Sequence, residues 1–378
     1  MASSADIRTG LVIKMETKQI SALQNQNYQA AAVSLQGLNH AASDTPMQDH
    51  HALISLPNDW MLAVVTDGVG SEPHSDEGSL EAAQSFANFV KDYWGYFQDR
   101  DSLLNLLKSA CLFAAGRMQR LADHAGIPVN RYSTTLHAAL FAGSQLYYAH
   151  AGDGGIIAFT EGGELLPVTS PLREEEYVIP LLAGPDYWHF GVADQPVKSV
   201  LLCTDGVYDK LAGALLRNQD CRMDRALTAW FVSPWAWDPK ENPEKLAFEI
   251  ESAFRGTKES FFYERMARAL AQGQDAETAL EFIKAHLVDN NRPIKTLQTI
   301  GDDITAAVVH RVYGTPSIQP LSYYMPPDWD QIYRNVYQIL YGNQPSGTVE
   351  NKAPVSDKPH ESAGNAPSPT SDDTLNPQ

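Results

Sequence analysis

Five short apolar runs, each the length of a β-strand, lie between turn-forming residues and constrain the fold of this chain more than any other feature. They occupy residues 61–66, 135–142, 146–151, 200–204 and 305–312. Several are rich in β-branched or aromatic residues and are bounded by Asp-Gly or Gly-Asp, which is typical of strands that meet a turn. The runs therefore predict a protein built largely on β-sheet.

Two long helical patterns separate the first run from the second. One helical face carries Leu80, Ala83, Ala87, Val90 and Trp94, and the next carries Leu103, Leu107, Ala110, Ala114, Met118 and Leu121. Strands, two long helices and then more strands indicate an α+β fold with segregated layers rather than a strict βαβ alternation. Residues 214–298, with tryptophans near prolines and then helical patterns, are expected to form a mostly helical insertion.

The two ends of the chain differ from its middle in composition. Residues 343–378 contain six prolines and no aromatic residue, so they cannot bury enough apolar surface to offset their ordering entropy, and we expect a disordered tail. Residues 1–30 are polar, with no apolar run resembling a signal peptide. No stretch reaches the roughly 18 apolar residues that a membrane span needs, so no membrane partner is expected.

Charge and cysteine content exclude several classes of function. The formal net charge is −18, with 46 acidic and 28 basic residues, and such a surface repels nucleic acid and anionic lipid. The three cysteines, Cys111, Cys203 and Cys221, have no ligand-like spacing, which argues against a structural zinc site and a disulfide framework. A cytoplasmic location is expected.

Aspartates recur at the ends of the apolar runs. Asp67 stands in TDGVG, Asp153 in AGDGG, Asp205 in TDGVYD and Asp302 in GDDIT, while Asp49 precedes another apolar run. Any one of them has a plain explanation as part of a tight turn. Together, flanked by small residues, they indicate one site for a hard divalent cation, because such cations prefer carboxylate, carbonyl and water oxygens.

The order of these motifs resembles the PP2C family of metal-dependent protein phosphatases, especially its divergent bacterial branch. The matching segments span about residues 33–312 and are Gly37-Leu38-Asn39-His40, Gln48-Asp49, Asp67-Gly68-Val69-Gly70, Gly78, Ser133-Thr134-Thr135, Gly152-Asp153, Asp205-Gly206 and Asp302-Asp303-Ile304-Thr305. Each motif is weak alone, and the set is specific.

The resemblance implies a four-layer α-β-β-α sandwich of two antiparallel sheets, with a metal centre where the sheets meet at one edge. It also implies a domain organisation for this chain. We expect an N-terminal extension over residues 1–32, a PP2C-like domain over 33–342 that carries the insertion at about 214–298, and the tail over 343–378.

The resemblance also implies roles for individual residues. Asp67, the Gly68 carbonyl, Asp205 and Asp302 match the positions that hold two Mg²⁺ or Mn²⁺ ions. Asp49 matches a carboxylate bound through metal-held water, and Asp153 matches a third metal position. The implied reaction is hydrolysis of phosphoserine or phosphothreonine in a phosphorylated protein substrate, with a water activated between two metals attacking phosphorus in line.

Two positions depart from the family pattern. Val69 stands where many eukaryotic members have a His that protonates the leaving alkoxide, and His40 stands where the family has a phosphate-binding Arg. His40 or His74 could supply the missing proton, although a surface or core role is the simpler explanation for either one alone. The candidate catalytic residues are therefore His40 and Asp49.

Three other interpretations compete with an active PP2C-type enzyme. A haloacid-dehalogenase-type phosphatase needs a nucleophilic Asp two residues before the second one, where this chain has Val65 and Cys203. A phosphate-loop nucleotidase needs a G-x-x-x-x-G-K-[ST] motif, which the chain lacks. A catalytically silent PP2C-like binding or regulatory module is favoured by Val69 and the missing Arg, and opposed by the retained aspartates.

Overall fold

Two antiparallel β-sheets form the centre of the computed structural model. The structure describes residues 17–174, 177–212, 223–232, 242–255, 297, 300–314, 316, 317, 319, 320 and 323. One antiparallel sheet has, in spatial order, β1 (Lys18–Gln24), β2 (Tyr28–Leu35), β13 (Ile304–Arg311), β12 (Val197–Cys203), β7 (Gly155–Thr160) and β8 (Leu165–Pro167). The second sheet has β11 (His189–Val192), β6 (Gln145–Ala151), β5 (Leu136–Ala142), β4 (Trp60–Asp67) and β3 (Asp49–Leu56). A separate hairpin consists of β9 (Arg173–Glu174) and β10 (Tyr177–Val178).

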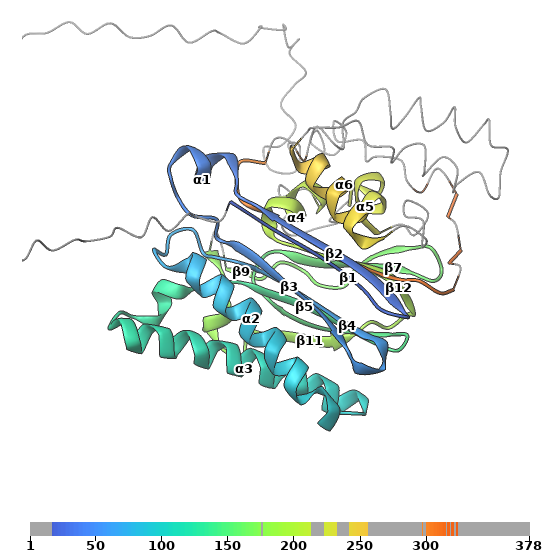
Figure 1. Cartoon of the computed structure of the whole chain (residues 1–378), viewed down its shortest axis with the longest axis horizontal. Coiled ribbons are helices and arrows are strands. Elements are labelled where there is room, and N and C mark those ends of the chain that lie inside the picture. Colours follow the sequence, from blue (N-terminus) through green and yellow to red (C-terminus); the bar gives the residue numbers. More distant parts are fainter. Residues whose placement is uncertain are drawn as a thin grey trace, which may run out of the picture. The chain divides into compact units, whose positions relative to one another are not determined.

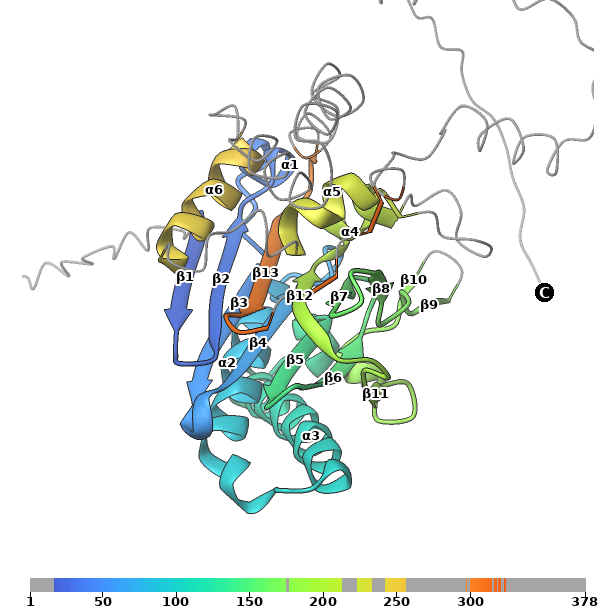
Figure 2. The same ribbon diagram turned by 90° about the vertical axis from the view of Figure 1, so that its right-hand side faces the viewer.

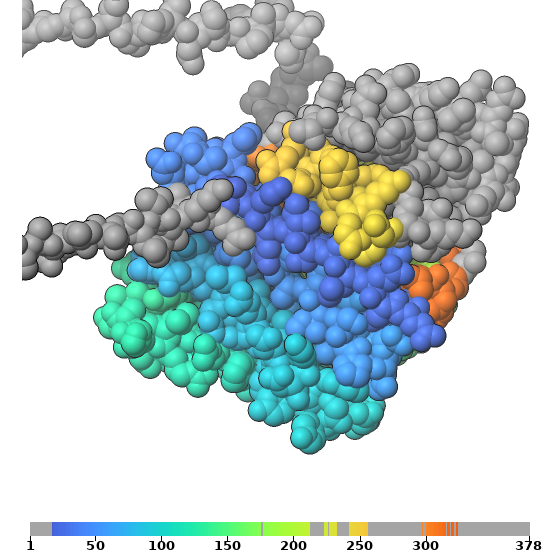
Figure 3. Space-filling model, in the orientation of Figure 1, coloured from blue at the N-terminus to red at the C-terminus, as the bar shows by residue number. Residues whose placement is uncertain are grey.

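Helices cover the outer face of each sheet, as Figures 1 and 2 show. The second sheet is covered by α2 (Ser75–Tyr93) and α3 (Arg100–Ala125), and the first by α4 (Asp205–Ala212), α5 (Arg225–Val232) and α6 (Pro243–Arg255). Figure 3 shows α6 lying against the first strands of the sheet, where Lys18 of β1 pairs with Glu251 of α6 at 3.1 Å. The shorter helical elements are α1 (Leu38–Ala42) and single turns at Pro57–Asp59, Trp94–Tyr96, Val129–Tyr132 and Leu181–Ala183.

Three apolar cores separate the four layers, and the alternation of side chains along each strand creates them. In β4, Leu62 and Val64 pack toward α2 and α3, whereas Met61, Ala63 and Val65 join the core between the two sheets. The third core lies between the first sheet and α4–α6, and Trp230 is its largest fully buried side chain. The protein is therefore an α-β-β-α sandwich.

Local sequence signals explain where the longest helix begins and ends. Asp99 accepts a hydrogen bond from the Ser102 amide at 2.9 Å, while the Ser102 hydroxyl accepts one from the Asp99 amide, which is a capping box. Gly126 ends the helix with φ +70°, a conformation that glycine adopts without steric cost.

All five predicted strands and both long helices are confirmed, as β4, β5, β6, β12, β13, α2 and α3. Residue 33, where we expected the PP2C-like domain to begin, lies inside β2. This strand pairs with β1 along its whole length and also with β13, so β1 and all of β2 belong to the first sheet. Within 214–298 the described residues include the helices α5 and α6. The rest of that segment and the tail at 343–378 lie outside the described residues.

None of the helices in the described part of the chain is both long and apolar enough to cross a membrane.

Candidate metal centre

Asp67 ends β4, and its peptide group is held on both sides by the start of β5. Its carbonyl oxygen accepts hydrogen bonds from the Thr134 hydroxyl and the Thr135 amide, both at 2.8 Å. Its amide donates to the Thr135 hydroxyl at 3.0 Å. The Ser-Thr-Thr motif thus fixes the backbone from which the Asp67 carboxylate projects. Asp49, the first residue of β3, lies directly opposite Asp67 in the antiparallel register.

The residue after Asp67 must be a glycine for steric reasons. A Cβ on Gly68 would lie 2.7 Å from the Ser75 carbonyl oxygen at the start of α2, which is closer than real contacts allow. The Gly68 amide donates to the Gln48 carbonyl oxygen at 3.0 Å. The Asp67-Gly68 turn is therefore held between the start of β3 and the start of α2.

Asp153 lies in the link by which the chain passes from the second sheet to the first. Gly152 before it has φ +113°, and a Cβ there would lie 2.4 Å from the Thr135 Cβ, so the turn requires glycine. Asp205 is the first residue of α4 and follows β12 after one residue. Because β7 and β12 are neighbours in the first sheet, both aspartates reach the same edge of the sandwich.

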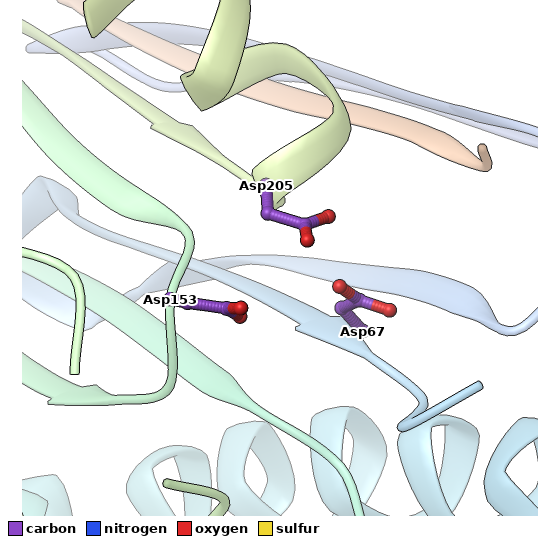
Figure 4. Close-up of side chains that lie close together, drawn as sticks. All are labelled: Asp67, Asp153 and Asp205. Atoms are coloured by element: carbon purple, nitrogen blue, oxygen red, sulfur yellow. The ribbon is translucent and has the colours of Figure 1, made fainter. Parts of the chain in front are cut away.

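Three of the predicted aspartates converge at this edge. Asp67, Asp153 and Asp205 each offer a carboxylate oxygen, and these oxygens all lie within 4.8 Å of one another. Figure 4 shows the three side chains pointing toward a common centre from β4, from the β6–β7 link and from the start of α4. The arrangement is an all-oxygen donor set, which suits Mg²⁺ or Mn²⁺ better than a soft metal.

The electrostatics of the cluster favour a bound cation. Burial, followed by repulsion from Asp49 and Asp205, raises the pKa of Asp67 well above its usual value. Burial and the charges of Asp153, Asp302 and Asp209 raise the pKa of Asp205 to about 7. Carboxylates that repel one another in a partly dry site favour any divalent ion that offsets their charge.

Asp49 is buried behind the three-carboxylate group and is held by a neutral donor. The Thr204 hydroxyl donates to its Oδ2 at 2.8 Å. Burial and then the charge of Asp303 raise the pKa of Asp49 well above its usual value, and the hydrogen bond from Thr204 opposes that rise. Thr204 immediately precedes Asp205. The end of β12 therefore both provides the Asp205 carboxylate and donates a hydrogen bond to the Asp49 carboxylate.

Asp302 and His40 lie beside the cluster rather than within the three-carboxylate group. Asp302 contributes repulsion to Asp49, Asp67 and Asp205, but its own side chain is 61% exposed. His40 stands between two aspartates, with Nδ1 at 3.0 Å from Asp303 Oδ1 and Nε2 at 3.9 Å from Asp302 Oδ1.

His74 is in a different setting from His40. Its ring stacks on Tyr132, and its Nδ1 lies 3.2 Å from Glu77 Oε1 in a partly exposed pair at the start of α2.

Asp303 links three elements around the centre. Its Oδ1 accepts from the Gly37 amide at 2.6 Å, and its Oδ2 accepts from the Gln48 amide at 2.5 Å. These bonds fix the start of α1 and the residue before Asp49 against the start of β13. Asp303 belongs to one of the motifs that resemble the family, but the sequence predicted no role for it.

Arg173 and Asp209 also belong to the centre and were missed. Arg173 Nε lies 2.8 Å from Asp153 Oδ2, and its terminal nitrogen lies 3.4 Å from Asp205 Oδ2 and 3.9 Å from Asp209 Oδ2. Asp209 had a usable signal, because it is four residues after Asp205 on α4 and so shares its helix face. No local sequence signal identifies Arg173, because only the tertiary structure brings the β9–β10 hairpin to the edge of the sandwich where the aspartates lie.

Comparison with known proteins places the chain in a family. Residues 36–245, more than half of the chain, match the family model described as Protein phosphatase 2C. A search of curated protein sequences finds no match.

Solved structures of similar fold include the catalytic domain of the serine/threonine protein phosphatase PstP in complex with two manganese ions. The two sequences are 18% identical, the match covers 76% of this chain and 99% of that chain, and the TM-score is 0.44. RsbX in complex with magnesium has 14% identity, coverage of 78% and 100%, and a TM-score of 0.39. PppA of Pseudomonas aeruginosa, a regulatory component of T6SS, has 16% identity, coverage of 77% and 100%, and a TM-score of 0.43. On the family match, this chain belongs to the protein phosphatase 2C family.

Proposed function

We propose that this protein is a metal-dependent phosphatase that hydrolyses phosphoserine or phosphothreonine in phosphorylated protein substrates. The observation that carries the proposal is the convergence of Asp67, Asp153 and Asp205 within 4.8 Å. Membership of the protein phosphatase 2C family supports the reaction class. A cytoplasmic location is part of the same proposal, supported by the three cysteines and their spacing.

Mg²⁺ or Mn²⁺ fits the donors present. Asp67, the Gly68 carbonyl, Asp205 and Asp302 would hold two ions, Asp49 would act through ion-bound water, and Asp153 would face a third ion. When bound, such ions lower the pKa of water and neutralise charge on phosphoryl oxygens, which are the two needs of phosphoester hydrolysis. The raised pKa of Asp67 and of Asp205 supports this assignment, because burial and neighbouring carboxylates disfavour the ionised form of both groups.

The chain's own residues hold this donor set in place. Thr134 and Thr135 fix the Asp67 peptide, and the Thr204 hydroxyl leaves Asp49 one oriented carboxylate oxygen. Asp303 holds the backbone next to Asp49 through the Gln48 amide. Preorganised donors of this kind need little rearrangement during the reaction, which is the usual source of electrostatic catalysis.

Val69 has no ionisable group, so another residue must protonate the leaving alkoxide. His40 is our candidate, because it is the histidine that lies beside Asp302 at 3.9 Å and it is partly exposed. Histidine is the side chain that most often transfers a proton to a leaving group in general acid catalysis.

The proposal is tested by assaying the full-length protein with para-nitrophenyl phosphate and Mn²⁺. We expect metal-dependent turnover that Asp205→Ala lowers by orders of magnitude, because one carboxylate of the centre is lost. Asp123→Ala on the exposed face of α3 removes the same charge and should leave turnover unchanged. Wild-type turnover in the folded Asp205→Ala protein would show that the centre is wrongly assigned.

A second candidate is a catalytically silent PP2C-like domain that binds a partner. It is favoured by Val69 at the family's acid position and by the engagement of His40 with Asp303 at 3.0 Å. A folded protein that binds Mn²⁺ but turns over neither para-nitrophenyl phosphate nor a phosphopeptide would support this alternative.

A further inference from the structure

Arg173 places a positive charge inside the acidic cluster. Its ion pairs reach Asp153 at 2.8 Å, Asp205 at 3.4 Å and Asp209 at 3.9 Å. The guanidinium lowers the pKa of Asp153, although burial raises that pKa more strongly. A guanidinium stays charged at every physiological pH, so this cation is permanent.

The backbone around Arg173 is fixed on the centre. The Leu172 amide donates to the Gly152 carbonyl oxygen at 2.7 Å, one residue before Asp153. Upstream, the Ser170 carbonyl oxygen lies 2.8 Å from His150 Nε2. Downstream, the Leu181 amide donates to the Thr134 carbonyl oxygen at 2.8 Å. The segment that carries Arg173 is thus attached upstream to β6 and downstream to Thr134, whose hydroxyl holds the Asp67 backbone.

The charged groups are largely removed from water. The Arg173 side chain is 18% exposed and the Asp153 side chain 9% exposed. Breaking such a pair is costly, because it leaves one buried charge without compensation. A metal ion that binds Asp153 must therefore displace the guanidinium or bind beside it against charge repulsion.

We propose that Arg173 is a built-in cation that competes with a third metal ion for Asp153, so that the wild-type protein holds two ions tightly and a third only weakly. This inference rests on the proposed metal centre. Arg173 is a residue that determines metal stoichiometry, and it acts through Asp153 and Asp205 rather than on substrate.

Titration calorimetry with Mn²⁺ on the full chain tests the inference. We expect two tight ions in the wild type and three in Arg173→Met, with the third ion bound about tenfold more tightly, or better, than in the wild type because a nearby positive charge is gone. Arg173→Lys keeps the charge and should resemble the wild type. Arg117→Met is the matched control, because it removes an arginine whose ion pair with Glu81 at 2.7 Å joins α3 to α2.

Further variants make the outcomes decisive. Adding Asp153→Asn to Arg173→Met should abolish the additional ion. If Arg173→Met does not fold, Arg173→Gln removes the charge with a polar side chain and carries the same expectation. Equal stoichiometry and equal affinities in the wild type and the charge-removing variant would overturn the role of Arg173. Absence of Mn²⁺ binding in the wild type would instead refute the metal centre itself.

Discussion

Asp49 and Asp67 face each other across β3 and β4 in the antiparallel register. Their nearest hydrogen-bond donors are neutral: the Thr204 hydroxyl holds the Asp49 carboxylate, while Thr134 and Thr135 hold only the Asp67 backbone. On the other side of the centre, Arg173 compensates Asp153. The uncompensated charge is therefore concentrated on the Asp49–Asp67 side, where two metal ions would do the most to relieve repulsion.

His40 can be assigned a role by comparing two substrates on one variant. Phosphoserine leaves as a poor alkoxide that needs a proton, whereas para-nitrophenol leaves readily as an anion. If His40 is the acid, His40→Gln should lower kcat for a phosphopeptide by about 100-fold, within the usual range for general acid catalysis, and change para-nitrophenyl phosphate turnover much less.

Other roles for His40 give different results in the same experiment. If His40 orients the phosphate, both substrates suffer about equally, and mainly in KM. If its contact with Asp303 is purely structural, thermal stability falls while kinetics per folded molecule do not. An unchanged substrate ratio with unchanged rates would remove His40 from the active site.

At the scale of elements, Asp303 joins the start of β13 to α1 and to β3. Its carboxylate accepts two backbone hydrogen bonds, from Gly37 and Gln48, and hydrogen bonds to charged groups contribute about 1.5–3 kcal/mol each. We expect Asp303→Ala to lower the free energy of unfolding by about 3 kcal/mol in urea titrations. It should also weaken Mn²⁺ binding, because the backbone next to Asp49 is released.

Asp303→Asn is the matched control for the two hydrogen bonds that Asp303 accepts from the Gly37 and Gln48 amides. It retains one carbonyl oxygen and should lose less stability than Asp303→Ala, although its amide group cannot accept from the second backbone N–H. Equal Mn²⁺ affinity in the wild type and in Asp303→Ala would show that these two hydrogen bonds contribute to folding stability and not to metal binding.

Strand prediction followed the β signal of the side chains only in part, because β7, with the sequence GIIAFT, was not predicted despite its isoleucines and phenylalanine. The run VVTD of β4 and VLLC of β12 are β-branched or strongly apolar, and both strands were predicted. In contrast, β2 has the sequence YQAAAVSL, whose alanines have low β-propensity, although all eight of its residues are buried. Pairing with β1 and β13 decides the conformation of β2, and that pairing is not visible in the local sequence.

In the candidate site, some residues carry a local sequence signal and others are revealed only by tertiary contacts. The convergence of Asp67, Asp153 and Asp205 could be predicted because each stands beside a turn at a strand end, a pattern that is local in sequence. The roles of Arg173 and Thr204 depend on contacts with Asp153 and Asp49 that join residues far apart in the chain. No local signal marks an arginine in a two-residue strand as a neighbour of carboxylates, so tertiary structure alone reveals it.

At the scale of the whole sandwich, the centre draws residues from both sheets, and buried hydrogen bonds connect them. The Thr305 hydroxyl donates to Ser34 Oγ at 2.7 Å, and Ser34 lies 2.8 Å from His51 Nδ1. Ser34 must then donate to His51, which leaves His51 Nε2–H to donate to Ser21 at 3.0 Å. Neutral His51 thus ties β3 of one sheet to β1 and β2 of the other, next to Asp49.

Two groups of buried side chains should give the metal-free protein opposite responses to pH. Burial lowers the pKa of His50 and His150 to about 4 and of His51 and His310 to about 3. Their stabilising contribution is present above the unfolded pKa near 6.5 and is lost as pH falls toward these values. The pKa of Asp205 is raised to about 7, so its contribution is present at low pH and is lost as pH rises through 7.

Asp205→Asn leaves these histidines unchanged, so the difference between the wild type and this variant isolates the carboxylate effect between pH 6.5 and 8. In EDTA, the wild type should lose about 1 kcal/mol of unfolding free energy across this range relative to Asp205→Asn, because release of one proton changes stability by about 1.4 kcal/mol per pH unit. Saturating Mn²⁺ should remove the loss, since bound cations offset the ionised carboxylates. His310→Gln should change the wild-type slope little near pH 8, where the imidazole is neutral in both states, and flatten it below about pH 6.5. Parallel wild-type and Asp205→Asn curves in EDTA would mean that Asp205 is already compensated without metal, with Arg173 at 3.4 Å as the available partner.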